Sequence, residues 1–175
     1  DVMQCMNVTN EIYGDSTQMV VHGISMGGAT SMMVSGEPQP DYVKCFVDDC
    51  GYTSVWDQFC KELKEDFGIP AFPLLYTSSW LCDLTKGWNF TEASSLEQVK
   101  KCQLPMLFIH GDADPIGSMT SVKVWEKLLQ MGIQSELHTL AKRNHCFQRT
   151  ASPGTGSYSF MDRIWEYLTA KGFNK

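Results

Sequence analysis

The chain has 175 residues, of which 43% are hydrophobic and 19% charged, and this balance indicates one globular domain rather than a disordered segment. A formal net charge of -6 at pH 7 does not suit binding to nucleic acid, which requires a basic surface, and a small, uncharged substrate fits better. No apolar run approaches the roughly 18 residues of a membrane span, so we expect a soluble protein, cytoplasmic or exported.

The elements alternate along the chain. Short apolar runs predict four strands, the first of them buried, at residues 18–24, 42–47, 104–110 and 135–140. Apolar residues at helical spacing, or a compact run of small residues, predict helices at residues 2–13, 27–34, 119–129 and 160–168. Strands that alternate with helices predict an α/β fold, with a parallel sheet and helices on both of its faces.

A long stretch rich in aromatic residues, residues 55–90, interrupts this alternation between the second and third strands. We interpret it as a mostly helical cap, inserted at about residues 55–95 of a single partial domain that spans residues 1–175. A cap at this point is expected over the carboxyl ends of the strands, where ligands bind in such folds. Candidate substrate-binding residues in it are Trp56, Phe59, Phe72 and Trp80. The alternative is a small hydrophobic subcore, because aromatic side chains dominate packing wherever they occur.

The pentapeptide Gly23-Ile24-Ser25-Met26-Gly27 has the form G-x-S-x-G and lies between a predicted strand and a predicted helix. This context is typical of a nucleophile elbow, a strained turn that lifts a serine above the sheet. We expect both glycines to be required, because a side chain two positions before or after the serine would collide with neighbouring backbone. The backbone N–H of Met26 is the candidate oxyanion donor, at the amino terminus of the following helix.

A serine hydroxyl needs a base to become a nucleophile, and the sequence offers four histidines. His22 and His138 lie inside predicted strands and His110 ends one, so each has a structural interpretation. His145 lies in the loop between the last predicted strand and the last predicted helix. We therefore predict that His145 is the general base.

The acid is expected in the loop after the third strand, where the segment HGDADP carries two carboxylates. Asp114 lies further along this loop, toward His145, and is the preferred acid. Asp112 is the alternative, because it can instead cap the tight turn at the strand end. Asp48 and Asp49, after the second strand, are third choice and are interpreted as turn residues.

The seven cysteines give no sign of a metal centre. They are scattered along the chain and include no Cys-x-x-Cys pair with metal-ligand spacing. We therefore expect buried free thiols, no bound metal and no cofactor.

Together these motifs resemble the serine hydrolases of the α/β-hydrolase superfamily, especially bacterial esterases and lipase-like proteins with a GxSMGG elbow and an HGDxD acid loop. The resemblance spans nearly the whole chain and implies Ser25 as nucleophile, Met26 as oxyanion donor, Asp114 as acid and His145 as base. His145-Cys146-Phe147 resembles the HGF-type segment of acetyl and carbohydrate esterases. The GISMGG segment is more similar to serine aminopeptidases and monoacylglycerol lipases.

The same resemblance implies about four further strands before the elbow, which this chain does not carry. The elbow strand would then be an exposed edge, through which the chain could self-associate. We expect a serine hydrolase that cleaves acyl or acetyl esters of small substrates through an acyl-serine intermediate. The alternatives are a serine peptidase or aminopeptidase with the same triad, and a non-catalytic fragment that acts as an interaction module.

Overall fold

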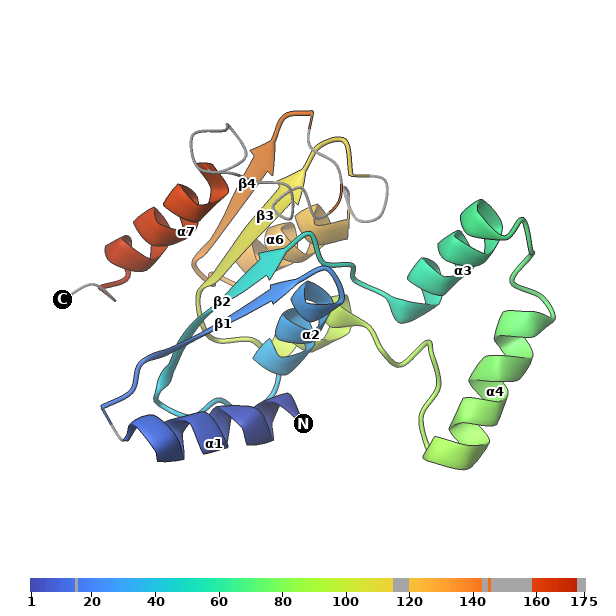
Figure 1. Ribbon diagram of the computed structural model, residues 1–175, viewed down its shortest axis with the longest axis horizontal. Helices are drawn as coiled ribbons and strands as arrows, with labels where there is room; N and C mark the ends of the chain where they lie inside the picture. Colours follow the sequence, from blue (N-terminus) through green and yellow to red (C-terminus); the bar gives the residue numbers. More distant parts are fainter. Residues whose placement is uncertain (15, 115–119, 143–144, 146–158, 173–175) are drawn as a thin grey trace.

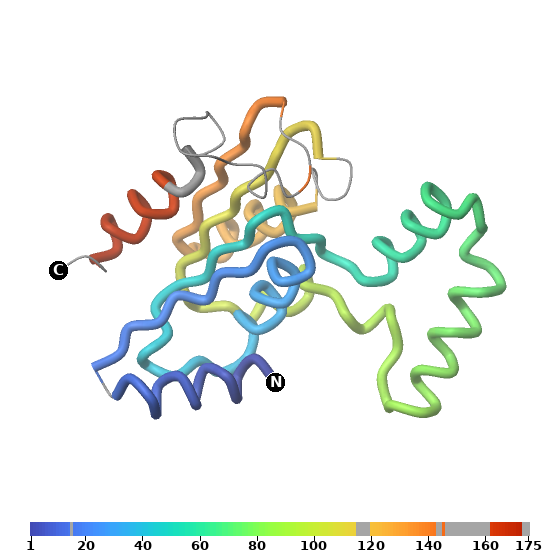
Figure 2. The backbone as a smooth tube through the Cα atoms, viewed as in Figure 1, coloured from blue at the N-terminus to red at the C-terminus, as the bar shows by residue number. Residues whose placement is uncertain are grey.

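The computed structural model describes residues 1–14, 16–114, 120–142, 145 and 159–172 (Figures 1 and 2). Its strands are β1 (Met19–Ile24), β2 (Val43–Asp49), β3 (Met106–Gly111) and β4 (Ser135–Leu140). Its helices are α1 (Val2–Tyr13), α2 (Met26–Ser35), α3 (Val55–Asp66), α4 (Leu74–Lys86), α5 (Ser95–Gln98), the 3-10 turn η1 (Val99–Lys101), α6 (Thr120–Gln130) and α7 (Ser159–Ala170).

The four strands form one parallel sheet in the order β1-β2-β3-β4, so each strand pairs with its neighbour in the sequence. A helical connection separates each strand from the next, as parallel pairing requires. All four carboxyl ends therefore meet at one edge of the sheet. This is the edge at which α/β folds bind their ligands.

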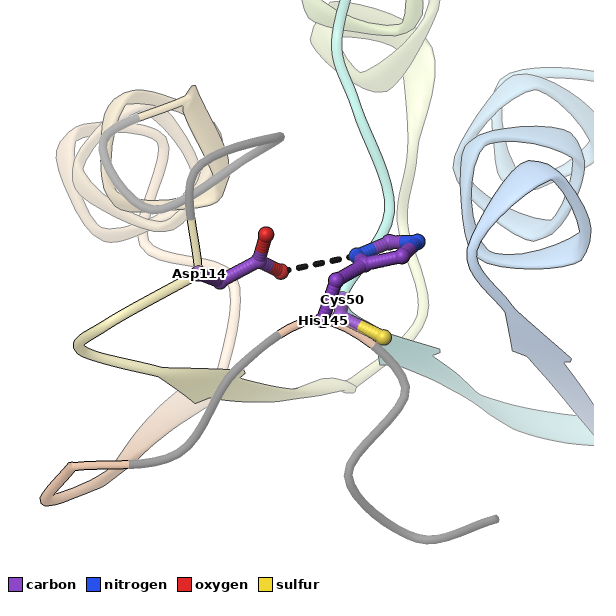
Figure 3. A group of neighbouring side chains, drawn as sticks. All are labelled: Cys50, Asp114 and His145. Atoms are coloured by element: carbon purple, nitrogen blue, oxygen red, sulfur yellow. Dashed lines mark hydrogen bonds and ion pairs between the residues drawn. The ribbon is translucent and has the colours of Figure 1, made fainter.

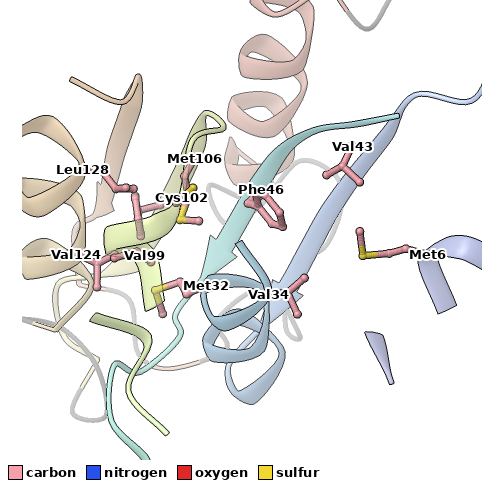
Figure 4. Packing of buried hydrophobic residues seen from close by; sticks show 11 residues of the cluster. Met6, Met32, Val34, Val43, Phe46, Val99, Cys102, Met106, Val124 and Leu128 are labelled. Atoms are coloured by element: carbon pink, nitrogen blue, oxygen red, sulfur yellow. The ribbon is translucent and has the colours of Figure 1, made fainter. Parts of the chain in front are cut away.

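The two central strands are buried on both faces, and their side chains alternate between two cores. Phe46, Met106 and Phe108 face the core that α1, α2 and α6 cover, together with Met6, Met32 and Leu128 (Figure 4). The intervening Cys45, Val47, Leu107 and Ile109 face the opposite core, which Ile164 and Tyr167 of α7 cover. Helices on both faces of a parallel sheet confirm the predicted α/β class.

The predicted strands and helices are confirmed, with two corrections. The prediction that β1 is buried is wrong: only Gly23 is buried in this strand, because β1 lies at the edge of the described sheet and pairs with β2 alone. β2 also extends two residues beyond its predicted end. Asp48 and Asp49 thus belong to the strand, where both are fully buried, rather than to a turn after it.

The inserted segment is mostly helical, as expected, and consists mainly of α3 and α4. In Figure 1 these helices extend away from the sheet, to the right of α2. Their aromatic rings contact one another, with centroids 4.9 Å apart for Trp56 and Tyr76 and 5.8 Å apart for Phe72 and Tyr76. Phe72 and Trp80 are each about two-thirds exposed.

Of the described cysteines, Cys45 and Cys102 are buried, Cys60 and Cys82 half-buried and Cys5 exposed, and these five are free thiols. Cys50 is also buried. Cys146 lies outside the described residues. Within the described part of the chain, no helix has the length and apolarity needed to cross a bilayer. Self-association through β1 stays a prediction.

Candidate active site

The carboxyl edge of the sheet brings together side chains from four separate segments. Ser25 follows β1, Cys50 follows β2, Asp114 lies in the turn after β3, and His145 follows β4. These residues are up to 120 positions apart in the sequence, and the parallel order of the strands places them at one edge. The site is thus a product of topology and not of local sequence.

Ser25 occupies a strained turn between β1 and α2. Its backbone angles are φ 56° and ψ -115°, although serine carries a side chain that disfavours positive φ. The Ser25 N–H donates to the carbonyl of Asp49 at 2.8 Å, which anchors the turn to the end of β2. A Cβ atom at Gly23 would overlap the backbone carbonyl of Gly27, so only glycine fits at that position. This geometry agrees with a nucleophile elbow.

The second required glycine is Gly28 rather than Gly27, which corrects the sequence-based expectation. A Cβ atom at Gly27 would meet no described atom within 4 Å. At Gly28 a Cβ atom would overlap the Asp48 carboxylate and lie 3.0 Å from the Gly51 Cα atom. The physical reason is that Gly28 is on the buried face of α2, against the end of β2, whereas Gly27 is on its open side.

A chain of two hydrogen bonds connects Ser25, His145 and Asp114. Ser25 Oγ lies 2.7 Å from His145 Nε2, and His145 Nδ1 lies 2.9 Å from Asp114 Oδ2 (Figure 3 shows the second contact). The Asp114 side chain is fully buried, while that of His145 keeps 18% of its surface exposed. With Asp114 ionised, Nδ1 carries the proton that Asp114 accepts, and Nε2 is left to accept the serine proton.

The other candidate acids do not lie in this chain of hydrogen bonds. Asp112 is exposed, and its carboxylate accepts the backbone N–H of Lys142, which connects the ends of β3 and β4. Asp48 Oδ1 accepts the Gly51 N–H at 3.0 Å, and its Oδ2 accepts the Ser121 hydroxyl at 3.0 Å. Burial raises the pKa of Asp48 to about 7. Asp49 lies 3.8 Å from His22, measured from Oδ2 to Nε2.

Sequence reasoning missed two residues of this edge. His110 was interpreted as structural, yet its Nε2 atom lies 3.1 Å from Asp114 Oδ2. Cys50 was counted among the core thiols, yet its sulfur lies within 4.8 Å of donor atoms of Asp114 and His145. The only available signal was position, because His110 ends one predicted strand and Cys50 follows shortly after another.

A pocket of about 310 Å³ opens beside the elbow, between α2 and the base of the cap. Most of its lining is apolar and includes Met26, Ala29, Met33, Val55, Phe59 and Ala93. Of the four candidate substrate-binding residues only Phe59 lines it; Trp56, Phe72 and Trp80 do not. A larger depression of about 1000 Å³, between Ser35 and Lys44, lies at the amino-terminal edge of the sheet, opposite Ser25.

Met26 is the first residue of α2. An N–H in the first turn of a helix has no partner within that helix, and the helix dipole makes this position favourable for negative charge. The side chain of Met26 is 69% exposed, so this end of α2 is open to solvent beside Ser25. These features suit the expected oxyanion donor, whose role stays a prediction.

Comparisons with known proteins agree with this fold. Residues 1–171 match the prolyl oligopeptidase family. The uncharacterized protein YqkD of Bacillus subtilis is 30% identical over 108 residues, which cover 61% of this chain and 35% of YqkD. The resemblance to α/β-hydrolases stated from the sequence is confirmed.

Among solved structures, the acylaminoacyl peptidase of Pyrococcus horikoshii superimposes with a TM-score of 0.68 at 18% identity, over 95% of this chain and 26% of the peptidase. The Pyrococcus furiosus esterase Pf2001 gives a TM-score of 0.62 at 18% identity, over 87% of this chain and 53% of the esterase. The chain therefore spans between about a quarter and a half of these proteins.

Proposed function

Because this chain belongs to the prolyl oligopeptidase family, we propose that it carries the nucleophile, base and acid of a serine hydrolase that cleaves small carboxylic esters. The observation that carries the proposal is the continuous Ser25–His145–Asp114 hydrogen-bond chain, with contacts of 2.7 and 2.9 Å. A chance meeting of these three side chains would not also place the serine in a strained turn at a helix amino terminus.

The reaction has two steps. Ser25 Oγ attacks the ester carbonyl while its proton passes to His145 Nε2, and the tetrahedral intermediate expels the alcohol, which takes that proton. Water then attacks the acyl-serine, gives its proton to His145 and releases the carboxylic acid with regeneration of Ser25. Asp114 stays ionised and holds the Nδ1–H of His145 in both steps.

The Met26 backbone N–H stabilises the negative charge that develops on the carbonyl oxygen during each attack. Its place as the first residue of α2, directly after Ser25, supports this role. One such donor typically contributes about 100- to 1000-fold to kcat. Met26 acts through its backbone, so substitution of its side chain is expected to matter little for this role.

The apolar pocket beside Met26 supports a small hydrophobic group as part of the substrate. Phe59 and Met33 contribute apolar walls, and among the described residues no charged side chain lines the pocket. The other three candidate residues of the cap lie outside this lining: Trp56, Phe72 and Trp80. We therefore propose that they contact substrate only if the cap moves.

A second candidate is peptide hydrolysis, and a specific observation favours it. The family that the chain matches is named for a peptidase, and one similar structure is an acylaminoacyl peptidase. Both reactions use the same triad and differ in the leaving group, an alcohol or an amine. Parallel assays on p-nitrophenyl esters and on aminoacyl p-nitroanilides distinguish them, since only a peptidase cleaves the anilides at a comparable kcat/KM.

The proposal is tested by covalent labelling with a fluorophosphonate probe. We expect one modified residue, Ser25, because a hydroxyl reacts only when a base activates it. Ser25→Ala should abolish labelling, and Ser78→Ala, which removes an exposed serine of α4, should leave it unchanged. Labelling that maps elsewhere, or that survives in Ser25→Ala, would refute the assignment.

Kinetics give a second, independent test. His145→Ala should remove most of the activity toward p-nitrophenyl acetate, and the double variant with Ser25→Ala should lose little more, because triad residues act as a unit. If the losses of the two single variants, expressed as logarithms, summed to the loss of the double variant, the proposed triad would be contradicted.

A further inference from the structure

Cys50 is a buried thiol that the proposed reaction does not use. It follows β2 with a positive φ of 49°, and its N–H donates to the Ile109 carbonyl at 2.8 Å, which fixes its backbone between β2 and β3. Figure 3 shows its side chain beside the imidazole of His145 and near Asp114. Donor atoms of the three residues all lie within 4.8 Å of one another.

The chemistry of this donor set selects a narrow class of metal ion. A thiolate, an imidazole and a carboxylate are the ligands of Zn²⁺ sites, whereas Mg²⁺ and Ca²⁺ require oxygen ligands. In a tetrahedral Zn²⁺ site neighbouring ligand atoms are about 3.4 to 3.6 Å apart. Atoms at the 4.8 Å limit therefore need to approach by about 1.2 to 1.4 Å, whereas His145 Nδ1 and Asp114 Oδ2, which are 2.9 Å apart, need to separate by about 0.5 to 0.7 Å. Rotation of the side chains can supply shifts of this size. Three protein ligands leave a fourth position for water.

A buried carboxyl group lies next to Cys50 in the sequence. Asp49 precedes Cys50 directly and is fully buried, and neither of its carboxylate oxygens has a hydrogen-bond partner among the described residues. A buried carboxyl group without a hydrogen-bond partner is an unmet acceptor directly beside one of the proposed ligands in the chain.

We propose that Cys50, Asp114 and His145 form an inhibitory site for Zn²⁺ or a cation of similar softness. In binding, the Cys50 S–H bond breaks, a sulfur–zinc bond forms, and the proton is released to solvent. Where zinc takes Nδ1 of His145, the proton of that nitrogen moves to Nε2, so the imidazole stays neutral. Binding is thus tighter at higher pH. The three proposed ligands follow three different strands and form no local motif. The spacing of cysteines in the sequence therefore does not predict this site.

Inhibition follows from the hydrogen bonds already present. His145 Nε2 pairs with Ser25 and Nδ1 pairs with Asp114, so both ring nitrogens are occupied. A cation that takes either nitrogen must break one of these two contacts. The base is then lost, or it is held in the wrong protonation state for proton transfer from Ser25.

Metal binding is measured directly with Co²⁺, which substitutes for Zn²⁺ and gives a thiolate-to-cobalt charge-transfer band in the near ultraviolet. We expect the band with the wild-type protein at pH 8, its loss in Cys50→Ala and Cys50→Ser, and its retention in Cys60→Ala. Cys60 is a demanding control because its half-buried thiol is more accessible than that of Cys50. Absence of the band in the wild type, or its persistence in Cys50→Ala or Cys50→Ser, would overturn the proposal. Folding of each variant is verified by circular dichroism, and Cys50→Ser serves if Cys50→Ala does not fold.

The inhibitory effect, which rests on the proposed hydrolase function, is tested separately. Zn²⁺ should inhibit p-nitrophenyl acetate hydrolysis reversibly, with full recovery after addition of EDTA. Loss of one ligand should raise the Zn²⁺ concentration for half-inhibition by about ten-fold or more in Cys50→Ser. Equal sensitivity of the wild type and Cys50→Ser would overturn the inhibitory role. A cobalt band in a protein without hydrolase activity would instead support the metal site and refute the proposed function.

Discussion

The imidazole of His110 lies 3.1 Å from the carboxylate of Asp114, measured from Nε2 to Oδ2. The same oxygen accepts the Nδ1–H of His145 at 2.9 Å. His110 is almost fully buried, and the contact does not have hydrogen-bond alignment. One carboxylate oxygen thus lies between two imidazoles, and His110 restricts where that oxygen can move.

We predict that His110→Phe lowers kcat for ester hydrolysis by about ten- to a hundred-fold with little change in KM, because a looser Asp114 misplaces the base. His110→Gln keeps a polar N–H group of similar reach beside the Asp114 carboxylate and should restore most of the activity. The measurement is steady-state kinetics of both variants, with circular dichroism to verify folding. Equal loss in the two variants would mean that His110 only fills space.

Asp114→Asn should lower kcat by about 10⁴-fold, because an amide cannot hold the imidazole in the tautomer that accepts the serine proton. Asp112→Asn is the matched control. Asp112 accepts the Lys142 N–H through a carboxylate oxygen, and an asparagine retains an oxygen for that role, so a mild loss is expected. Similar kcat values for the two variants would reverse our choice of acid.

The two glycines after the elbow should differ in their tolerance of alanine. Gly28→Ala places a methyl group against Asp48 and Gly51 and should lower the free energy of unfolding by about 1 to 3 kcal/mol. Gly27→Ala enters open space in a helix and should be neutral or stabilising by up to about 1 kcal/mol. Urea unfolding measures both, and comparable destabilisation would contradict the described packing of α2.

Asp48 should make stability depend on pH. Burial raises its pKa from 3.8 to about 7, so between these values the folded protein holds a proton that the unfolded chain has released. The contribution of the protonated Asp48 carboxyl to the free energy of unfolding is therefore fully present below about pH 4. It is lost as the pH rises from there through about 7.

Asp48→Asn cannot ionise at this position. The stability of the variant minus that of the wild type should therefore be greater at pH 8 than at pH 5. The asparagine can still accept the Gly51 N–H, and the Ser121 hydroxyl retains a second acceptor in the Gly51 carbonyl at 3.2 Å. Thermal unfolding at the two pH values measures the difference. The exposed control Asp66→Asn should follow the wild type. The same stability difference at both pH values would show that Asp48 does not titrate in this window.

Much of this protein can be predicted from local patterns in its sequence. Helical spacing of apolar residues, runs of Val and Ile, and glycines at helix ends predicted every described strand and all the longer helices outside the cap, because these signals act within a few residues of one another. The elbow around Ser25 was equally local: a serine between two glycines, after a strand and before a helix. The order of the remaining residues along the chain pointed to His145 and Asp114.

Tertiary structure alone decided what depends on distance. The order β1-β2-β3-β4 brings residues from four strand ends within hydrogen-bond reach, and no spacing in the sequence encodes the 3.1 Å contact of His110 or the position of Cys50. Packing against β2 decided that Gly28, and not Gly27, must lack a side chain. The place of the cap was also beyond the sequence, since aromatic residues pack equally well over a site or beside it, and only contacts between segments distinguish the two.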